Sequence, residues 1–573
     1  MARAPGSPMK GTWRRRYRRL LDLPSGMLQG RILYGAKRPV FAGALYDRLL
    51  LGRREPSLRA IPADPWPADA ARGREIATGS FHLAQQTIRE PVPLGRPIGA
   101  GEAWRVAFNG FDWLADLMAL GAPAAPVALA FLERWLMENQ RWEALAWRPD
   151  VIGRRLSAWL AQPMLLAAGG NAALKLRIGE AVERQTRHLA HALPGGLAGQ
   201  ALLSGVKGLI LGALALGHEG LLAAGLKQLA RALPRQLLAD GGHVERSPAV
   251  QLAVLRDLCD LRIALESAGR QGPSELVLAI ERMAPVLRMF QASDGGLALF
   301  NDSDEGPAGA VDLTLMRADA KAKALASAPQ SGFHRLAAGP AVVLVDAGRP
   351  PPPGLDSHAH AGTLSFELYH GKERVIVNCG AQPAEGEWLL AQRSTAAHST
   401  ITVDDTNSSA LMPDGHGLAR PPSEVIVRRE EAEGNLWLET SHDGYLPNYG
   451  LLHHRRLYLS ADGADLRGHD RLEGGGGKRF TLRFHLHPGV DASLAQDKQA
   501  VLLRLPSGAG FRLRSQVLAA PGIAETGEVA LGESIYLGRS GEPRRSQQVI
   551  VTGELMGAGA EIKWQLSREN RRK

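Results

Sequence analysis

The stretch His358-Ala-His-Ala-Gly-Thr-Leu-Ser-Phe-Glu-Leu368 lies close to the point where the periodicity of the sequence changes. Its second half alternates apolar and polar residues, with Leu364, Phe366 and Leu368 at every other position. Residues two apart in an extended segment point the same way, so His358 and His360 would share a face. The stretch therefore predicts the opening of the core of a C-terminal β domain.

The region after residue 330 follows a period of two over many short segments. These segments are residues 342–346, 364–368, 374–378, 400–404, 424–428, 436–440, 456–460, 480–487, 501–505 and 511–514. Turns bearing Gly and Asp join them, such as Ala461-Asp-Gly463 and Gly474 to Gly477. Short alternating strands without intervening helices are typical of an antiparallel β-sandwich.

The region before residue 325 has a helical period instead, because apolar residues recur at spacings of three and four. The segments are residues 113–120, 127–142, 151–166, 173–193, 201–216, 221–233, 249–267 and 276–289, separated by Gly or Pro. Successive antiparallel helix pairs of this kind either stack as an open solenoid or close into a ring. Gly205, Gly208 and Gly212 favour close helix packing, as in the inner layer of a ring.

Helices followed by strands predict two packed domains rather than an α/β fold. We expect a basic, Pro-rich N-terminal arm with short helices at 1–100, a helical domain at 101–325 and a β-sandwich at 326–573.

The net charge of +10 is concentrated in the arm. Residues 1–60 hold 14 Lys and Arg against Asp22, Asp47 and Glu55, so the rest of the chain is close to neutral. This distribution argues against a polyanion-binding cleft in the body and against specific nucleic-acid binding. The arm could contact acidic lipid, nucleic acid or an acidic patch of its own protein, or remain solvated.

The cysteines and the apolar segments indicate which covalent links and which localisation to expect. Cys259 and Cys379 make neither a disulfide framework nor a CxxC metal site. The first thirty residues lack an apolar run followed by a small-residue cleavage site. The most apolar segment, Ala201 to Gly217, is too short and too interrupted to predict a membrane span. We expect a cytoplasmic protein, or a periplasmic one if the start of the chain is misassigned.

Histidines in the β half suggest a metal site. His358, His360 and His398, together with the amide oxygen of Asn378, would lie on neighbouring strands and could bind zinc. An isolated His-x-His pair is also common as a surface or hydrogen-bonded pair.

The succession of motifs is more specific than any one of them. After the His358 stretch come Asn378-Cys-Gly380 and Arg393-Ser-Thr-Ala-Ala-His398, and Asp240-Gly-Gly-His-Val-Glu-Arg-Ser-Pro248 lies in the helical half. Over roughly residues 100 to 570 the chain resembles the heparinase II/III family of polysaccharide lyases, although that family has Asp-x-Gly where Asn378 stands. The resemblance implies an incomplete (α/α) toroid followed by an antiparallel β-sandwich. It also implies a structural zinc ion on His360, Asn378 and His398.

The family chemistry is β-elimination at a uronic acid, which needs a group on the carboxylate, a base and an acid. Val250-Gln251 stands where the family has Tyr-His, and Gln200-Ala201 where it has Asn-His. The remaining candidates are His358, His243, Arg246 and Tyr445 for catalysis, and Glu245, Gln200 and Gln251 for substrate binding. Three of these residues also have an alternative, purely structural interpretation. Glu245 and Arg246 would cap the helix that begins at Pro248, and Tyr445 would pack its ring in the protein interior.

Three functions follow. The first is a lyase-like enzyme acting on an acidic glycan or oligosaccharide. The second is a non-catalytic protein on a lyase fold that binds a glycan or an envelope component. The third is an interaction protein that acts through its basic arm.

Overall fold

The computed structural model describes residues 23–52, 55–63, 65–383, 386–496, 499–520, 523–525, 528–539, 543–555 and 559–569. These residues form two compact units. The helical unit holds the described residues up to Leu237 together with Ala253–Glu281, and the β unit holds Leu238–Leu252 and the described chain from Arg282 onward. The units therefore cut across the boundaries expected at residues 100 and 325.

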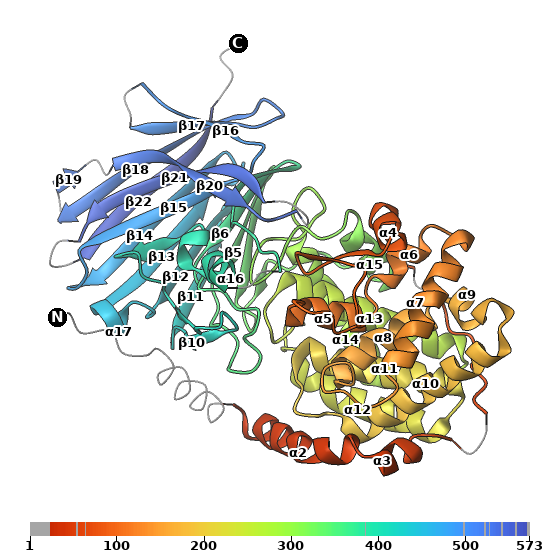
Figure 1. Cartoon of the computed structure of the whole chain (residues 1–573). Helices are drawn as coiled ribbons and strands as arrows, with labels where there is room; N and C mark the ends of the chain where they lie inside the picture. Colours follow the sequence, from red (N-terminus) through yellow and green to blue (C-terminus); the bar gives the residue numbers. More distant parts are fainter. Residues whose placement is uncertain are drawn as a thin grey trace, which may run out of the picture. The chain divides into compact units, whose positions relative to one another are not determined.

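Helices dominate the helical unit (Figure 1). They are α2 (Ser25–Phe41), α3 (Ala44–Leu49), α4 (Ala70–Ala77), α5 (Glu102–Asn109), α6 (Leu114–Met118), α7 (Ala125–Glu138), α8 (Pro149–Leu160), α9 (Pro163–Leu166), α10 (Ala172–Ala192), α11 (Gly199–Leu216) and α12 (Glu219–Gln236), followed by α13 (Pro248–Ser267) and α14 (Ser274–Phe290), which continue into the β unit. A small hairpin, β1 (Ser80–Leu83) and β2 (Gln86–Arg89), precedes α5.

Glycines let α8 and α11 approach closely, as their spacing predicts. A Cβ atom on Gly208 would lie 2.5 Å from the Cα of Gly153, and one on Gly153 would lie 2.1 Å from the carbonyl oxygen of Ser204. Neither distance is tolerable, so only glycine fits at this helix crossing. Among the described helices, α11 alone is long and apolar enough to cross a membrane, and 78% of it is buried inside the protein.

The β unit consists of two antiparallel sheets, each with nine strands in the described residues. One has the order β11-β12-β13-β14-β22-β18-β17-β16, with β19 on β18, and the other β20-β21-β15-β7-β6-β5-β4-β3, with β8 on β15. Their inner faces enclose a core of alternating apolar residues that includes Phe366, Leu438, Leu457, Phe484 and Trp564. The predicted order of helices and then an antiparallel sandwich is confirmed.

The strands that build these sheets are β3 (Ser327–Ala328), β4 (Phe333–Ala338), β5 (Ala341–Asp346), β6 (Phe366–His370), β7 (Glu373–Val377), β8 (Ile401–Val403), β11 (Val425–Ala432), β12 (Asn435–His442), β13 (Leu451–Leu459), β14 (Asp465–Gly474), β15 (Arg479–Leu486), β16 (Asp491–Leu494), β17 (Ala500–Arg504), β18 (Gly510–Ala520), β19 (Ile523–Glu525), β20 (Glu528–Tyr536), β21 (Arg544–Glu554) and β22 (Gly559–Glu569). A separate small pair is formed by β9 (Ala410–Leu411) and β10 (Leu418–Arg420). Three short helices also belong to this unit. Helix α15 (Ala310–Arg317) precedes β3, α16 (Gly386–Arg393) follows β7, and α17 (Leu446–Tyr449) follows β12.

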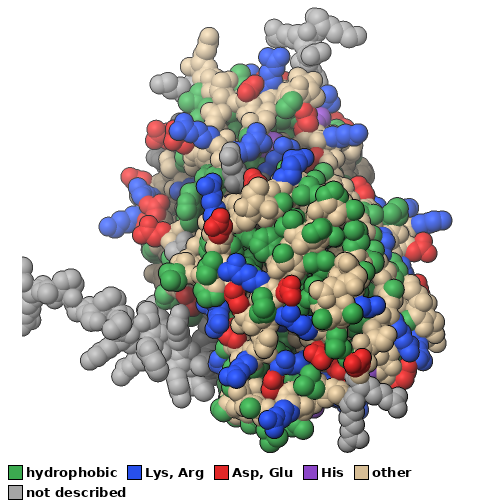
Figure 2. Space-filling view, turned by 45° about the vertical axis from the view of Figure 1, so that its right-hand side comes forward, with side chains coloured by type: hydrophobic (Ala, Val, Ile, Leu, Met, Phe, Trp, Pro, Cys, Tyr) green, Lys and Arg blue, Asp and Glu red, His purple; other side chains and the backbone are tan. Residues whose placement is uncertain are grey.

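The surface also carries large hydrophobic side chains. Figure 2, in which Ala and Pro are green together with the larger hydrophobic residues, shows green side chains over much of the face that is turned to the viewer. Among the described large hydrophobic residues Ile98 is the most exposed, at 97%.

Candidate functional site

The His358 stretch forms a loop that leads into β6, and its two histidines meet Asp302 of the same unit. Nδ1 of His358 lies 3.1 Å from one carboxylate oxygen of Asp302, and Nε2 of His360 lies 2.7 Å from the other. The guanidinium of Arg393 donates to both oxygens. We call these four residues the Asp302 cluster.

The charge of Asp302 is fixed by this cluster. Burial alone would raise its pKa, but Arg393 and the hydrogen bonds from His358 and His360 outweigh burial and hold the pKa far below its usual range. The backbone of Asn301 and Asp302 is left-handed, with φ of 48° and 57°. Non-glycine residues are costly in that conformation, so the surrounding contacts must impose it.

His358 is the exposed member of the cluster, with 35% of its side chain accessible. Its second nitrogen, Nε2, lies 3.4 Å from Oε2 of Glu245. Burial opposes protonation, but the hydrogen bond to Asp302 and the charges of Asp302 and Glu245 raise the pKa of His358. Both ring nitrogens of His358 therefore face a carboxylate, which favours the protonated, proton-donating form of the ring.

His243 is close to this cluster but differs in character. It is 1% exposed, its Nδ1 accepts from the amide of Glu245, and its Nε2 has no partner among the described residues. Burial and the neighbouring His358 lower the pKa of His243 to about 3, so the ring is neutral.

Arg246 does not have the catalytic role expected from the sequence. Its buried guanidinium donates to the Asp346 carboxylate and to the carbonyl of Ser331, and it lies over the ring of Phe333. Its own carbonyl accepts from Asn301. Arg246 therefore anchors the loop before α13 to the sandwich, which agrees with the structural reading.

Gln251 likewise holds the backbone rather than a ligand. The side chain is fully buried, its oxygen accepts from the amide of His243, and its nitrogen donates to the carbonyls of Gly241 and Met283. Val250 beside it is 3% exposed. Each polar atom of the Gln251 amide therefore already has a main-chain partner, and its substrate-binding role stays a prediction.

Gln200 belongs to the helical unit, in the first turn of α11, where it is half-buried. Further along the same helix, the ammonium of Lys207 lies 2.7 Å from both Asp257 and Asp260. The Lys207 ammonium is therefore held by two carboxylates of the same unit.

Tyr445 is also not available as a proton donor. It is fully buried in the sandwich core, and its hydroxyl donates to the carbonyl of Ile401 at 2.6 Å. Burial raises the pKa of Tyr445 well above its usual value. The packed-ring reading describes it correctly.

The expected zinc ligands converge only in part. Nδ1 of His360 lies 3.1 Å from Nε2 of His398, and Nδ1 of His398 is 2.7 Å from the carbonyl of Ser394. The oxygen of Asn378 accepts from the amide of Ser399, and its nitrogen has no partner in the described chain.

Two neutral imidazoles and an amide lack the ionised ligand of the family set. The described residues contain no group of three or more His, Cys, Asp or Glu placed to hold a metal. The residues present therefore do not fit a three-ligand zinc site, and no chemistry is derived through one.

Asp302 and Arg393 are the site residues that sequence reasoning missed. Arg393 stands in the Arg-Ser-Thr motif, but the motif alone gives it no partner. Asp302 follows the Ser293-to-Phe300 segment by two residues and carries no pattern of its own. Only the fold brings residues 302, 358, 360 and 393 together.

Comparison with known proteins places this geometry in a family. Residues 320–565 match the domain described as heparinase II/III-like, C-terminal. The chain is 32% identical over 574 residues to FtsZ-localized protein C of Caulobacter vibrioides (strain NA1000 / CB15N), covering 94% of this chain and 97% of that protein. The chain belongs to the heparinase II/III-like family.

Solved structures share the fold across nearly the whole chain. Heparinase III superposes with a TM-score of 0.71 at 15% identity, covering 95% of this chain and 92% of that one. A mutant of the heparan sulfate lyase HepC from Pedobacter heparinus gives 0.60 at 16% identity, with 94% and 89% covered. The chondroitin AC lyase of Streptomyces coelicolor A3 gives 0.52 at 12% identity, with 92% and 83% covered. At these identities the likeness concerns the fold.

Proposed function

We propose that this heparinase II/III-like protein has lost elimination chemistry and acts as a binding protein where FtsZ assembles. The observation that carries the first part is Gln251, whose amide is buried and committed to main-chain partners at the position of a family catalytic residue. The full-length relationship to FtsZ-localized protein C supports the second part.

Elimination needs a base at C5 of the sugar and an acid at the departing oxygen. In the β unit, His358 faces a carboxylate on each ring nitrogen and His243 is buried and neutral. Val250, beside Gln251, adds no ionisable group. Neither imidazole is thus placed to act as the base that starts the reaction.

Two measurements test this proposal. The full-length protein is sedimented with and without polymerised FtsZ, and we expect it to pellet only with the polymer. The same preparation is incubated with heparan sulfate, chondroitin sulfate and other uronate polymers, and we expect no ultraviolet absorbance from unsaturated uronate. Failure to pellet would remove the FtsZ part, and a rise in absorbance would remove the non-catalytic part.

The basic arm contributes a second contact, with an acidic membrane surface. On α2, Ile32, Leu33 and Val40 are 62%, 62% and 61% exposed. Ile32 and Val40 are two helical turns apart and Leu33 is adjacent, so they share one face. Leu45 and Leu49 of α3 are 72% and 68% exposed.

Cations lie beside this apolar surface at Arg31, Lys37, Arg38 and Arg48, and residues 1–22 add seven more in sequence. Exposed apolar residues flanked by Lys and Arg are typical of helices that lie in the interface of an anionic bilayer. We infer that this arm binds acidic lipid.

Vesicle sedimentation tests the arm. The full chain should pellet with vesicles containing phosphatidylglycerol and not with purely zwitterionic vesicles. Ile32→Asp/Leu33→Asp should abolish pelleting, whereas Val277→Asp/Leu278→Asp, an adjacent pair on α14 with 46% exposure each, should not. Equal losses in both variants would mean that α2 is not the contact.

Residual elimination remains a second candidate, favoured by the partial exposure of His358 between Glu245 and Asp302. In that case a uronate polymer would give unsaturated product, and His358→Ala would abolish it without changing the melting temperature. Silence of the wild-type protein across the polymer panel would exclude this candidate.

A further inference from the structure

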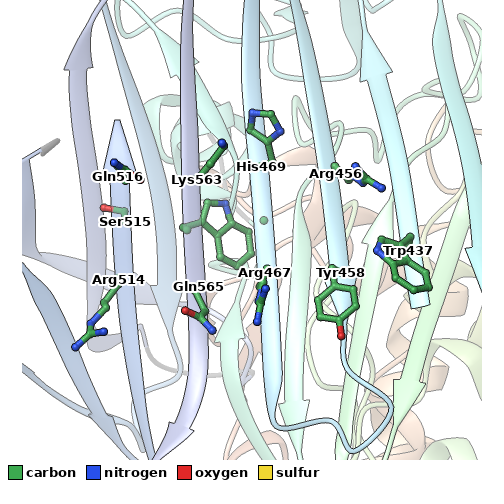
Figure 3. Close-up of a pocket in the computed structure, with 12 residues that line it drawn as sticks. Trp437, Arg456, Tyr458, Arg467, His469, Arg514, Ser515, Gln516, Lys563 and Gln565 are labelled. Atoms are coloured by element: carbon green, nitrogen blue, oxygen red, sulfur yellow. The ribbon is translucent and has the colours of Figure 1, made fainter. Parts of the chain in front are cut away.

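The outer face of one sheet carries two rows of side chains in register across five strands (Figure 3). The first row runs over β12, β13, β14, β22 and β18, and the second over β13, β14, β22 and β18. One row is Trp437, Tyr458, Arg467, Gln565 and Arg514, and the other holds Arg456, His469, Lys563 and Gln516. We call this surface the two-row face.

The two-row face is hollowed, with a cavity of about 770 Å³. Its lining contains four Lys or Arg residues and one His, and no Asp or Glu. Carboxylates stand only at its border, where Glu439 pairs with Arg456, Asp465 with Arg467 and Glu561 with His469. Lys563 and Arg514 are exposed, and neither makes an ion pair with any residue that the structure describes. The surface therefore has cations available for a ligand.

The four cations alternate between the rows from strand to strand. Arg456 on β13 and Lys563 on β22 lie in one row, while Arg467 on β14 and Arg514 on β18 lie in the other. Neighbouring strands are about 4.8 Å apart, so an extended chain crossing them would meet a cation on alternate sides. Side chains of an extended peptide also alternate in direction, which matches this arrangement.

The more accessible aromatic side chains lie at one end of the face, whereas Trp564, 3% exposed, lines the middle of the hollow from below. Trp437 and Tyr458 are half-buried and directly opposite each other, with ring centroids 5.2 Å apart. The guanidinium of Arg467 lies 5.5 Å from the Tyr458 ring. A repeating sugar polymer would favour aromatic platforms at intervals along the site. An aromatic end followed by cations fits a ligand that has an apolar group at one end and acidic groups after it.

We propose that the two-row face binds an extended acidic peptide segment of a partner protein. An apolar side chain of the segment packs on Trp437 and Tyr458, and the carboxylates that follow pair with Arg467, Lys563 and Arg514. Gln516 provides an amide group for the peptide backbone, and Gln565, whose nitrogen donates to Asp465, provides its amide oxygen. The site does not depend on which protein supplies the segment, so it stands independently of the FtsZ association proposed above.

Fluorescence anisotropy with the full chain tests this site. The probe is a labelled synthetic peptide with one Phe followed by a run of Glu, and the comparison peptide has Gln in place of every Glu. We expect saturable binding of the acidic peptide, weakened by salt because the contacts are exposed charges. Binding of the Gln peptide with equal affinity would overturn the proposal.

Variants locate the contact. Lys563→Glu/Arg514→Glu should raise the Kd on the order of tenfold or more, because two attractions become repulsions. Lys227→Glu/Arg231→Glu, with the same charge change on exposed positions of α12, should leave the Kd unchanged. Melting temperatures confirm that both variants fold. An unchanged Kd in the first variant would place the peptide elsewhere.

Trp437→Ala separates a peptide from a glycan. It should weaken the Phe-Glu peptide on the order of tenfold and have less effect on a peptide of Glu alone. A heparin-derived oligosaccharide serves as the competing ligand. If the oligosaccharide binds more tightly than the peptide and loses more affinity in Trp437→Ala, the face is a glycan site and the peptide proposal is wrong.

Discussion

Two aspartates in the β unit both pair with histidine and arginine side chains, but one of these clusters is completely buried and the other is partly exposed. Asp302 holds His358, His360 and Arg393. Asp470, between the sheets, holds His453 and Arg455 and accepts from the indole of Trp564. Asp470, His453 and Arg455 are completely buried, whereas His358 is 35% exposed. Similar residue types thus form a structural centre in one place and a surface that can meet a ligand in the other.

The contacts of Arg455 explain the structural role of the Asp470 centre. Arg455 extends from β13 and donates to the carbonyls of Leu364 and Ser399, which precede β6 and β8 of the other sheet. It therefore joins the two layers of the sandwich through polar contacts in an apolar core. The Asp302 cluster has no such position, and we expect its loss to be less destabilising.

The largest effect should come from Asp470→Asn. The substitution leaves the Arg455 cation buried without a counter-charge, which costs about 3–5 kcal/mol. Urea unfolding should show this loss, while Asp465→Asn, at a surface ion pair, should cost below about 1 kcal/mol. Similar values for the two variants would break the comparison.

A smaller loss is expected for Asp302→Asn. Arg393 keeps its hydrogen bonds to the carbonyls of Ser357 and Gly415, and the cluster is partly open to solvent, so we expect about 1–3 kcal/mol. The same urea experiment measures it. A loss as large as that of Asp470→Asn would show that the cluster supports the fold as strongly as the buried centre.

The next largest effect should be a loss of stability on acidification, through His442 beside the Asp470 centre. Burial, followed by the charges of His453 and Arg455, lowers the pKa of His442, so this ring stays neutral in the fold and is protonated on unfolding. The unfolded state then binds more protons, and stability falls as pH drops through about 6.5. For this residue the loss between pH 7 and 5.5 is about 1 kcal/mol. Unfolding of His442→Gln at both pH values should show a correspondingly flatter dependence.

Asn378→Asp should change the stability least of these variants, but it should change the zinc content of the protein. The substitution supplies the ionised oxygen that the ligand set of the family includes and this chain lacks. Metal analysis after dialysis should give close to one zinc per chain for the variant and far less for the natural protein. Adding His398→Ala to the variant should remove the metal, and equal zinc in all three proteins would argue against the site.

Sequence periodicity predicts the fold because the apolar residues on the buried face of each strand or helix recur at a fixed spacing within that element. Gly153 and Gly208 show the same for a close helix approach, which needs residues without side chains. Val250 and Gln251 also show, from their identity alone, that the Tyr-His pair of the family is replaced in this chain.

The polar clusters could not be predicted in this way, since their members are distant in sequence. Asp302 lies 56 residues from His358 and 91 from Arg393. Tyr445 shows the same limit, because its turn-rich segment left open whether the ring packs in the core, where it lies, or reaches a cleft. Burial depends on tertiary packing, which a local pattern does not contain.

The position of β22 has a consequence for biosynthesis. This strand is the last described segment of the chain, yet it lies between β14 and β18 in the middle of its sheet. A nascent chain that has not yet produced it has two unpaired strand edges, which are prone to aggregation. The surface built around Lys563 thus exists only once β22 has been made and paired, so any partner that recognises it also distinguishes chains that contain this strand from chains cut before it.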